Sequence, residues 1–319
     1  MNVKPVFLVT GADLAPQALA LLTDYEVVYA GKKPTEDDIV ALCKQHDPVA
    51  IIVRYSKVSA AAMQAAPSLR VISKHGSGTD TIDKVEAKAR GVEVVAAVGA
   101  NAAAVAEQAL ALLLACAKSV VALNERMHAG HWDKVTHKSV ELEGRTVGVI
   151  GLGAIGLRFA RMADAMGMRV LGRDPYAKDL PPYIQGADLQ TIWRESDAVS
   201  LHCPLTADNA ELINAQTLAA CKKGVLIVNT ARGGLIDEAA LLAAIRSGQV
   251  GGAGLDSFAV EPMTALHPFH GEARITLSPH IGGVTADAYV KMGVAAAMNA
   301  LAVLAAERVG GPSDLVESS

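Results

Sequence analysis

The sequence predicts an α/β protein with two parallel, doubly wound sheets, and three observations support this fold class. From Val6 to Ser73, short apolar runs alternate with helical patterns. A second alternating series begins at Arg145, and a glycine-rich turn follows its first run. The chain has 319 residues, of which 51% are hydrophobic, so it is long enough for two domains with separate cores. Such alternation is typical of parallel sheets with helices on both faces.

The first series predicts four strands and three helices. The strands are expected at Val6–Val9, Val27–Tyr29, Ala50–Val53 and Val71–Ser73. The helices are expected at Leu14–Leu22, Thr35–Lys44 and Ala60–Ala66. Thr35 is a candidate N-cap, because its hydroxyl can accept a hydrogen bond from the first turn.

The segment Ala100–Met127 predicts one long Ala/Leu-rich helix that is apolar nearly all round. Such a helix needs burial on several sides, either in a core between domains or in a subunit interface, and both interpretations stay open. Its most apolar part, Ala109–Ala117, is shorter than a membrane span, and the first apolar run of the chain is too short for a signal peptide. We therefore expect a protein that does not bind membranes.

The second series predicts a sheet of six strands and a last helix at Ala286–Ala306. The strands are expected at Arg145–Ile150, Arg169–Gly172, Ala198–His202, Val225–Asn229, Gly252–Leu255 and Ile275–Leu277. Six strands in two halves are typical of a Rossmann dinucleotide-binding domain.

The turn after the first of these strands has the spacing G-x-G-x-x-G. Gly151 permits the tight turn, Gly153 lets the backbone approach a pyrophosphate, and Gly156 allows close packing of helix against strand. The helix opens with Ala154 and Ile155, and free N–H groups at a helix start attract phosphates.

An acidic residue, Asp174, follows the next predicted strand. A carboxylate at this position accepts hydrogen bonds from the adenosine ribose hydroxyls, which favours NAD over NADP. Arg173 stands beside it, and a guanidinium there could instead pair with a 2′-phosphate. The cofactor expected is NAD, while the strictness of this preference stays open.

Charge and cysteine content argue against several other functions. The net charge is −4 and charges of both signs are mixed, which argues against a nucleic-acid or anionic-membrane surface. The cysteines have neither C-x-x-C nor metal-ligand spacing, so we expect reduced thiols in a cytoplasmic protein without a metal site. They are Cys43, Cys116, Cys203 and Cys221.

Three later residues suit proton and anion chemistry at the strand ends. Arg232 follows a predicted strand and precedes two glycines, where its forked side chain could bind a carboxylate or carbonyl. Glu261 and His280 each lie beyond a predicted strand. A carboxylate beside an imidazole raises the histidine pKa and orients the ring, which suits a proton donor near neutral pH.

These motifs together resemble the D-isomer-specific 2-hydroxyacid dehydrogenases over nearly the whole chain. Further matching segments are Lys74–Asp83, Asn101–Glu107 and Leu201–Thr206. The resemblance implies that Arg232 orients a 2-oxo acid and polarises its carbonyl. It implies that His280 exchanges a proton with the C2 oxygen, while Glu261 pairs with His280 and keeps its pKa high. Hydride would move between C2 and the nicotinamide ring.

The resemblance also implies the remaining contacts. Main-chain N–H groups of Gly76, Ser77 and Gly78 would bind the substrate carboxylate, since such a loop can form an anion-binding nest. Asp256 would hold the nicotinamide carboxamide, and Thr230 and Ala231 would line the ring. Pro204 and Gly282 complete the expected cofactor contacts.

The family layout implies a discontinuous substrate domain, flavodoxin-like, from residues 1–99 and 286–319. The Rossmann NAD-binding domain, residues 100–285, would be inserted into it. Family members are often homodimers joined through the cofactor domains, so a homodimer is expected.

Within the family, the chain looks most like a short form of the phosphoglycerate dehydrogenase branch, without its regulatory domain. Arg54, Lys57 and Lys134 lie where that branch presents cations to a phosphorylated substrate, although solvated surface cations are an equal alternative. Two residues depart from the common pattern: Ala154 replaces a frequent arginine, and Gln108 stands where a histidine is frequent.

The expected function is the interconversion of a small D-2-hydroxy acid and its 2-oxo acid. The substrate could be 3-phosphoglycerate, hydroxypyruvate or glyoxylate. One alternative is an NAD(H)-sensing interaction protein similar to the C-terminal-binding co-repressors, and another is an NADP-dependent glyoxylate/hydroxypyruvate reductase. A relative that oxidises formate is disfavoured, because such members replace the glutamate that stands here at Glu261.

Overall fold

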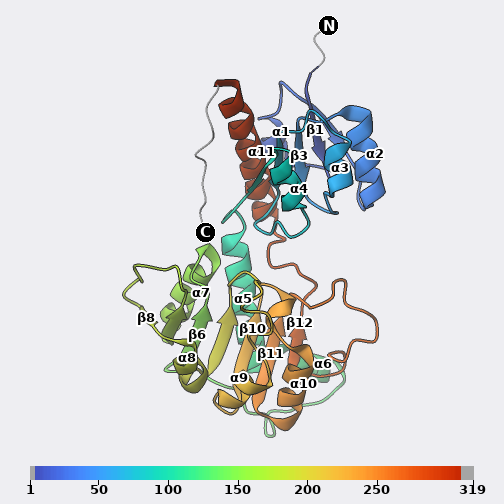
Figure 1. Cartoon of the computed structure of the whole chain (residues 1–319). Helices are drawn as coiled ribbons and strands as arrows, with labels where there is room; N and C mark the ends of the chain where they lie inside the picture. Colours follow the sequence, from blue (N-terminus) through green and yellow to red (C-terminus); the bar gives the residue numbers. More distant parts are fainter. Residues whose placement is uncertain (1–3, 310–319) are drawn as a thin grey trace. The chain divides into compact units, whose positions relative to one another are not determined.

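Residues 4–309 are described by the computed structural model, and the chain divides into two units (Figure 1). Unit 1 combines the residues up to Asn101 with those from Gly283 onward, and unit 2 is Ala102–Gly282. Each unit contains one parallel sheet with helices around it, so the predicted fold class is confirmed. Residues 310–319 of the expected substrate domain lie outside the described residues.

The sheet of unit 1 has five parallel strands in the order β2-β1-β3-β4-β5, the flavodoxin-like order. The strands are β1 (Val6–Val9), β2 (Glu26–Tyr29), β3 (Ala50–Val53), β4 (Val71–Lys74) and β5 (Glu93–Ala96). The central strands β1 and β3 are buried along their whole length, which explains their uninterrupted apolar runs. The fifth strand, β5, was not predicted; it lies at an edge of the sheet and has no fully buried residue.

Within residues 4–309, five helices surround this sheet. They are α1 (Pro16–Leu19), α2 (Glu36–His46), α3 (Ala60–Gln64), α4 (Lys84–Ala89) and α11 (Ala286–Val309). The predicted N-cap of α2 is confirmed: Thr35 Oγ1 accepts a hydrogen bond from the Asp38 amide at 3.2 Å, and Asp38 accepts one from the Thr35 amide at 2.8 Å.

The last helix, α11, joins the C-terminal part of the described chain to the N-terminal elements (Figure 1). The hydroxyl of Ser73 on β4 donates to the carbonyl of Ala296 at 2.8 Å, and Asn299 donates to the carbonyl of Ala96 on β5 at 2.9 Å. Within the described residues, α11 is long and apolar enough to cross a membrane by length and composition. Its small apolar residues, however, pack in the core of unit 1 with β1, β3 and β4.

Unit 2 has seven parallel strands in the order β12-β11-β10-β9-β6-β7-β8. They are β6 (Thr146–Ile150), β7 (Arg169–Arg173), β8 (Ile184–Gly186), β9 (Ala198–Leu201), β10 (Val225–Asn229), β11 (Val250–Leu255) and β12 (Ile275–Leu277). The direction of strand order reverses between β6 and β9, as in the Rossmann fold. The edge strand β8 was not predicted, since only one of its three residues is buried.

The helices of unit 2 correct one expectation. They are α5 (Ala102–Lys118), α6 (Val120–His128), α7 (Ala154–Ala165), α8 (Leu189–Glu195), α9 (Ala215–Ala220), α10 (Glu238–Ser247) and the 3-10 turn η1 (Gly233–Leu235). The single helix expected at residues 100–127 is wrong, because Ser119 adopts a φ of 52° and the chain bends by 61° there. Helix α5 is largely buried, whereas α6 has no buried residue.

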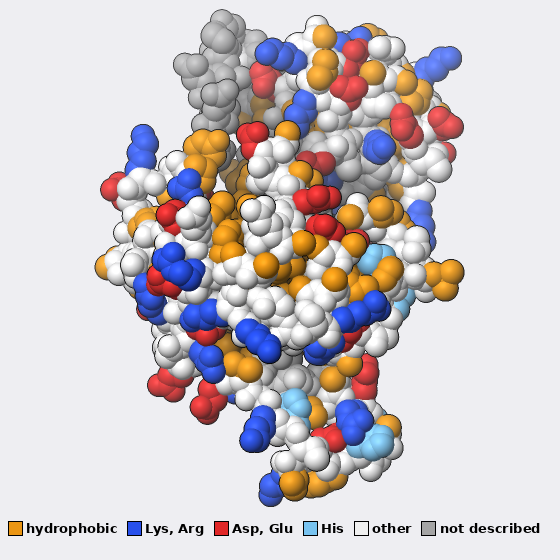
Figure 2. All heavy atoms as spheres, turned by 60° about the horizontal axis from the view of Figure 1, so that its bottom comes forward, with side chains coloured by type: hydrophobic (Ala, Val, Ile, Leu, Met, Phe, Trp, Pro, Cys, Tyr) orange, Lys and Arg blue, Asp and Glu red, His pale blue; other side chains and the backbone are white. Residues whose placement is uncertain are grey.

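Charges of both signs are interspersed on the face drawn in Figure 2. Lys and Arg side chains there lie beside Asp and Glu side chains, as the mixed sequence composition predicts.

His75, directly after β4, makes the stability of unit 1 depend on pH. Its ring lies 5.7 Å from that of Tyr289 on α11, and its Nε2 atom is buried without a hydrogen-bond partner among the described residues. Burial, and secondly the Arg54 charge, lower the pKa of His75 to about 4. The unfolded chain binds this proton near pH 6.5 and the folded chain does not. The free energy of unfolding is therefore not reduced by His75 above pH 6.5, and it falls as the pH drops from 6.5 toward 4.

We expect the free energy of unfolding to fall by about 2 kcal/mol from this group between pH 7 and pH 5. In His75→Gln this part of the loss should disappear, as measured by urea unfolding at both pH values. His270→Gln, which changes an exposed histidine, is the control and should retain the loss. An equal pH dependence in His75→Gln and the control would contradict the assignment.

Candidate active site

Five loops of unit 2 leave the sheet at the same edge. Because all strands are parallel, the residues that follow β6, β9, β10, β11 and β12 lie at their shared carboxyl ends. These are Gly151, His202, Thr230, Asp256 and Ser278. Ligands bind at this edge in open parallel sheets, close to the point where the strand order reverses.

The glycine turn brings the first two loops into backbone contact. Gly151 has a φ of 92°, and a Cβ atom there would lie 2.5 Å from the Cys203 amide nitrogen. A Cβ on Gly156 would lie 1.9 Å from the carbonyl oxygen of Gly151. A Cβ on Gly153, in contrast, would meet nothing within 4 Å. The N-terminus of α7 therefore borders open space of the kind that a pyrophosphate needs.

The carboxylate of Asp174 is held at this turn. It accepts hydrogen bonds from the amides of Leu152 and Tyr176, both at 2.8 Å. The neighbouring Arg173 has an exposed side chain and contributes its carbonyl, which accepts from the Gly151 amide at 2.9 Å. The acidic side chain, rather than the arginine, is thus fixed against the glycine turn.

The residues after β10 leave one polar group unsatisfied. Thr230 is 8% exposed, and its hydroxyl oxygen has no hydrogen-bond partner among the described residues. The amide of Ala231 is occupied, since it donates to Asn229 Oδ1 at 3.0 Å. A buried hydroxyl without a partner costs free energy unless a ligand supplies one. The open space at Gly153 and the hydroxyl of Thr230 both fit a dinucleotide along this edge.

Arg232 is positioned by the same asparagine and by a glycine. Asn229 donates through its Nδ2 to the Arg232 carbonyl at 2.8 Å, which closes the turn around Arg232. A Cβ on Gly233 would lie 1.8 Å from the carbonyl carbon of Phe258. Only glycine allows this approach, so the Arg232 turn packs directly on the segment that leads to Glu261.

Glu261 and His280 form a hydrogen-bonded pair. The Glu261 Oε1 atom accepts from the Phe258 amide at 2.9 Å, and Oε2 lies 2.7 Å from His280 Nδ1. Their side chains are 35% and 46% exposed, so a substrate can reach them. Because Nδ1 faces the carboxylate, Nε2 is the ring nitrogen left to exchange a proton with a ligand.

A second histidine and carboxylate anchor the Glu261 loop. Glu238, at the start of α10, accepts from the Ala259 amide at 3.0 Å and lies 3.2 Å from His267 Nε2. The Phe269 amide points to His267 Nδ1 at 3.3 Å. With Nδ1 facing the Phe269 amide, Nε2 is the ring nitrogen that faces Glu238, so His267 links the two parts of this loop.

The Asp256 carboxylate binds the loop that contains His280. Oδ1 accepts from the Ser278 hydroxyl at 2.6 Å and from the Ile281 amide at 2.9 Å. Oδ2 accepts from the Gly282 amide at 2.7 Å. Asp256 therefore holds the backbone on both sides of His280.

Two predicted substrate contacts belong to unit 1. Gly76 has a φ of 141° in the loop after β4, followed by the exposed Ser77 and the half-buried Gly78. Arg54 follows β3, next to the point where the strand order reverses between β1 and β3. Its guanidinium forms an ion pair with Asp13 and lies 4.9 Å from the centre of the Tyr289 ring.

Sequence reasoning missed three residues that shape the site. Asn229 and Gly233 stand inside the Arg232 motif, where a turn-forming amide and a double glycine were visible signals. Gln108 was noted only as a departure from a frequent histidine, yet its Nε2 donates to the Ser278 hydroxyl oxygen at 3.0 Å. No local signal could reveal a contact between residues so far apart in the sequence.

Comparisons with known proteins agree on one family. Residues 110–282 match the family described as D-isomer specific 2-hydroxyacid dehydrogenase, NAD binding domain. The hydroxypyruvate reductase of Thermotoga maritima is 38% identical over 86% of this chain and 90% of its own length. The D-3-phosphoglycerate dehydrogenase of Mycobacterium tuberculosis H37Rv is 39% identical over 96% of this chain, which spans only 58% of that protein. A glyoxylate reductase structure from Paecilomyes thermophila has a TM-score of 0.84 at 28% identity and covers 95% of this chain and 96% of its own.

The open space at Gly153 yields a prediction. Its φ of −72° suits alanine, so Gly153→Ala should fold with an unchanged melting temperature. The added methyl group would occupy the space into which a pyrophosphate must fit, and NADH should bind about tenfold more weakly, which corresponds to roughly 1.4 kcal/mol. Titration of NADH fluorescence measures this loss, and unchanged affinity would show that the turn does not contact the cofactor.

Proposed function

Because the chain belongs to the D-isomer specific 2-hydroxyacid dehydrogenase family, we propose that it interconverts a small D-2-hydroxy acid and its 2-oxo acid. It is an NAD-dependent oxidoreductase acting on CH–OH groups. The observation that supports the reaction most directly is the His280–Glu261 pair at 2.7 Å, next to the turn of Arg232.

In the direction of reduction, the residues of unit 2 supply one proton and an orienting charge. Glu261 accepts from Nδ1 of His280 and fixes the ring, so that Nε2 delivers a proton to the C2 oxygen as the carbonyl becomes a hydroxyl. Arg232 orients the acid and stabilises the charge that develops on this oxygen. NADH, when bound at this edge, would supply the hydride that adds to C2. In oxidation His280 accepts the same proton.

We propose that the edge of unit 2 holds the cofactor along its length. The amides of Gly153, Ala154 and Ile155 would face the pyrophosphate at the N-terminus of α7. Asp174 would accept from the adenosine ribose hydroxyls. The nicotinamide end would contact the remaining predicted residues, which are Pro204, Thr230, Ala231, Asp256 and Gly282.

Unit 1 is proposed to bind the acid. Main-chain N–H groups of Gly76, Ser77 and Gly78 would bind the carboxylate of the substrate. The proposed boundaries are 1–99 with 286–319 for the substrate domain and 100–285 for the NAD-binding domain.

The surroundings of Arg54 favour an acid without a phosphate. Its Nη1 donates to the Asp13 carbonyl at 2.8 Å and to the Asp13 carboxylate, and its side chain is only 12% exposed. A hydrogen bond from Tyr289, and after it Arg54, lower the pKa of Asp13, which therefore stays ionised and offsets the guanidinium charge. A phosphate would have to displace Asp13, so we propose hydroxypyruvate or glyoxylate over phosphorylated acids.

Two alternatives make different predictions. An NADP-dependent reductase would need Arg173 near the ribose, whereas Asp174 is the residue bonded to the glycine turn. A purely NAD(H)-sensing co-repressor-like protein would bind NADH without turning over any 2-oxo acid, so measured turnover separates it from an enzyme. The four cysteines are free thiols, which supports a reducing cytoplasm as the location.

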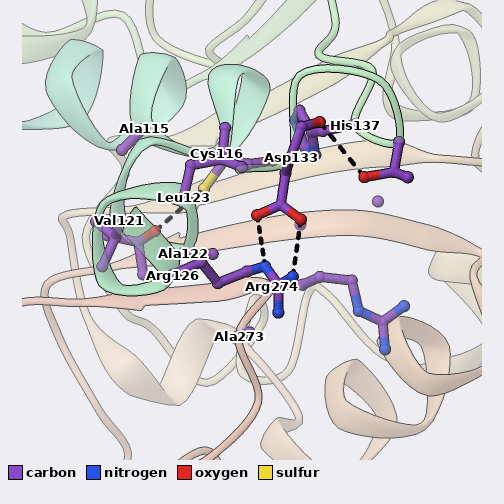
Figure 3. A pocket seen from close by; sticks show the side chains of 15 residues that line it. Ala115, Cys116, Val121, Ala122, Leu123, Arg126, Asp133, His137, Ala273 and Arg274 are labelled. Atoms are coloured by element: carbon purple, nitrogen blue, oxygen red, sulfur yellow. Dashed lines mark hydrogen bonds and ion pairs between the residues drawn. The ribbon is translucent and has the colours of Figure 1, made fainter. Parts of the chain in front are cut away.

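We propose a homodimer through unit 2. Helix α6 has no buried residue, and three of its large apolar side chains are exposed to solvent. Val120, Val121 and Met127 are 53%, 43% and 52% exposed. A pocket of about 270 Å³ lies beside it, and Figure 3 shows Arg126 turned toward Asp133 there. Arg126 of α6 donates two hydrogen bonds to Asp133, both at 2.7 Å. These bonds hold the segment after α6, which contains the exposed Trp132, against the helix. Exposed apolar side chains next to a pocket are suited to contact with a second copy of the chain.

The function is tested by NADH oxidation with a panel of 2-oxo acids. We expect turnover of hydroxypyruvate or glyoxylate, and weaker turnover of phosphohydroxypyruvate. His280→Ala and Arg232→Ala should each lower turnover by about 10²-fold or more, because a proton donor or an orienting charge is lost.

His270→Ala is the control, since this exposed histidine lies on the Glu261 loop without touching Glu261 or His280. Its turnover should match that of the unmodified chain. Absence of turnover with every acid and both NADH and NADPH would contradict the enzymatic function.

The dimer is tested by sedimentation velocity. We expect a species of twice the 33.0 kDa of one chain. Val121→Asp would bury a charge at the interface and should weaken association by tenfold or more, on the order of 1.4 kcal/mol. Val85→Asp, which alters an 83% exposed residue of unit 1, is the control. A monomer at all concentrations would rule the dimer out.

A further inference from the structure

Residues 278–282 hold His280 in a left-handed backbone conformation. His280 has a φ of 53°, and left-handed conformations of this kind are uncommon for residues other than glycine. Surrounding contacts must therefore determine the loop. These contacts are the three hydrogen bonds to Asp256 and the hydrogen bond from the His280 amide to the Ser278 carbonyl at 3.0 Å.

The Asp256 carboxylate is itself buried, with 1% of its surface exposed. A buried carboxylate needs donors on its oxygen atoms, and those donors come from the loop that it holds. Ser278, which is 8% exposed, gives its only hydroxyl proton to Asp256 at 2.6 Å. The Ser278 oxygen can then only accept from the amide of Gln108, so the chain of donors runs from Gln108 through Ser278 to Asp256.

Gln108 also packs against the other end of the loop. A Cβ on Gly282 would lie 3.6 Å from both Cβ and Cγ of Gln108, so the stem of this side chain borders Gly282. One residue of α5 thus contacts the loop on both sides of His280.

Resting on the proposed function, we propose that Gln108 and Ser278 are positioning residues that act through Asp256 to hold His280 against Glu261. Gln108 orients the Ser278 hydroxyl, Ser278 and the two loop amides fix the carboxylate, and the carboxylate fixes the backbone on either side of His280. None of these groups has to touch the substrate. Their effect is on the proton-transfer step, and therefore on kcat more than on KM.

The test compares Gln108→Leu with Gln249→Leu. Gln249 is half-buried in the same unit and donates to the carbonyls of Leu218 and Cys221, both at 2.9 Å, far along the chain from His280. We expect Gln108→Leu to lower kcat about fivefold, with KM for the 2-oxo acid within twofold. Gln249→Leu should lower the melting temperature and leave kcat unchanged. Gln108→His, which restores a donor, should recover most of the lost rate.

A second readout does not depend on turnover. Hydrogen exchange of the Ile281 and Gly282 amides, which donate to Asp256, should become faster in Gln108→Leu and not in Gln249→Leu. If the unmodified chain reduces no acid, the proposed function fails, and the exchange experiment still decides whether Gln108 holds the loop. Unchanged exchange and kcat in Gln108→Leu, or an equal loss of kcat in Gln249→Leu, would overturn the inference.

Discussion

The seven strands of unit 2 run in one direction, and this constraint brings residues from distant parts of the chain to one edge of the sheet. After each strand the chain returns to the opposite edge, through a helix in most cases and through a loop between β7 and β8 and between β11 and β12, so every functional loop starts from the same side. Two glycines then determine how closely these loops approach. Without a side chain at Gly151 and Gly233, the backbone of one loop rests on the backbone of the next. Backbone contacts between neighbouring loops therefore set the positions from which the functional side chains extend.

The two carboxylates near His280 have different surroundings and therefore different roles. Asp256 is buried and accepts three hydrogen bonds from the protein, so it is suited to holding the loop. Glu261 is more exposed and uses one oxygen atom for the Phe258 amide and the other for His280. The buried Asp256 carboxylate fixes the position of His280. The more exposed pair of Glu261 and His280 remains accessible to a ligand and can exchange a proton with it.

In unit 1, a contact between residues that are distant in the sequence changes the role expected of Arg54. Arg54 lies at the reversal point of the sheet, where an arginine could bind an anion. Its ion pair with Asp13 and its place over the Tyr289 ring leave the charge largely compensated within the unit. Tyr289 belongs to α11, so the environment of Arg54 is formed by both the N-terminal and the C-terminal parts of the described chain.

The sequence by itself determined the fold class and the glycine turn, and it predicted that Arg232, Glu261 and His280 each follow a strand, because these features depend on local signals. Uninterrupted apolar runs predict buried parallel strands, and the spacing of Gly151, Gly153 and Gly156 reflects contacts within one turn. Short edge strands such as β8 escaped prediction, since an edge position leaves little apolar pattern. The bend at Ser119 escaped as well, because a backbone angle is decided by packing rather than by composition. Only the tertiary structure decided that Gln108 donates to Ser278, a residue 170 positions away, and that Asp13 pairs with Arg54. Hydrogen bonds of this kind depend on where the packed sheet places two side chains, and no local pattern encodes that distance.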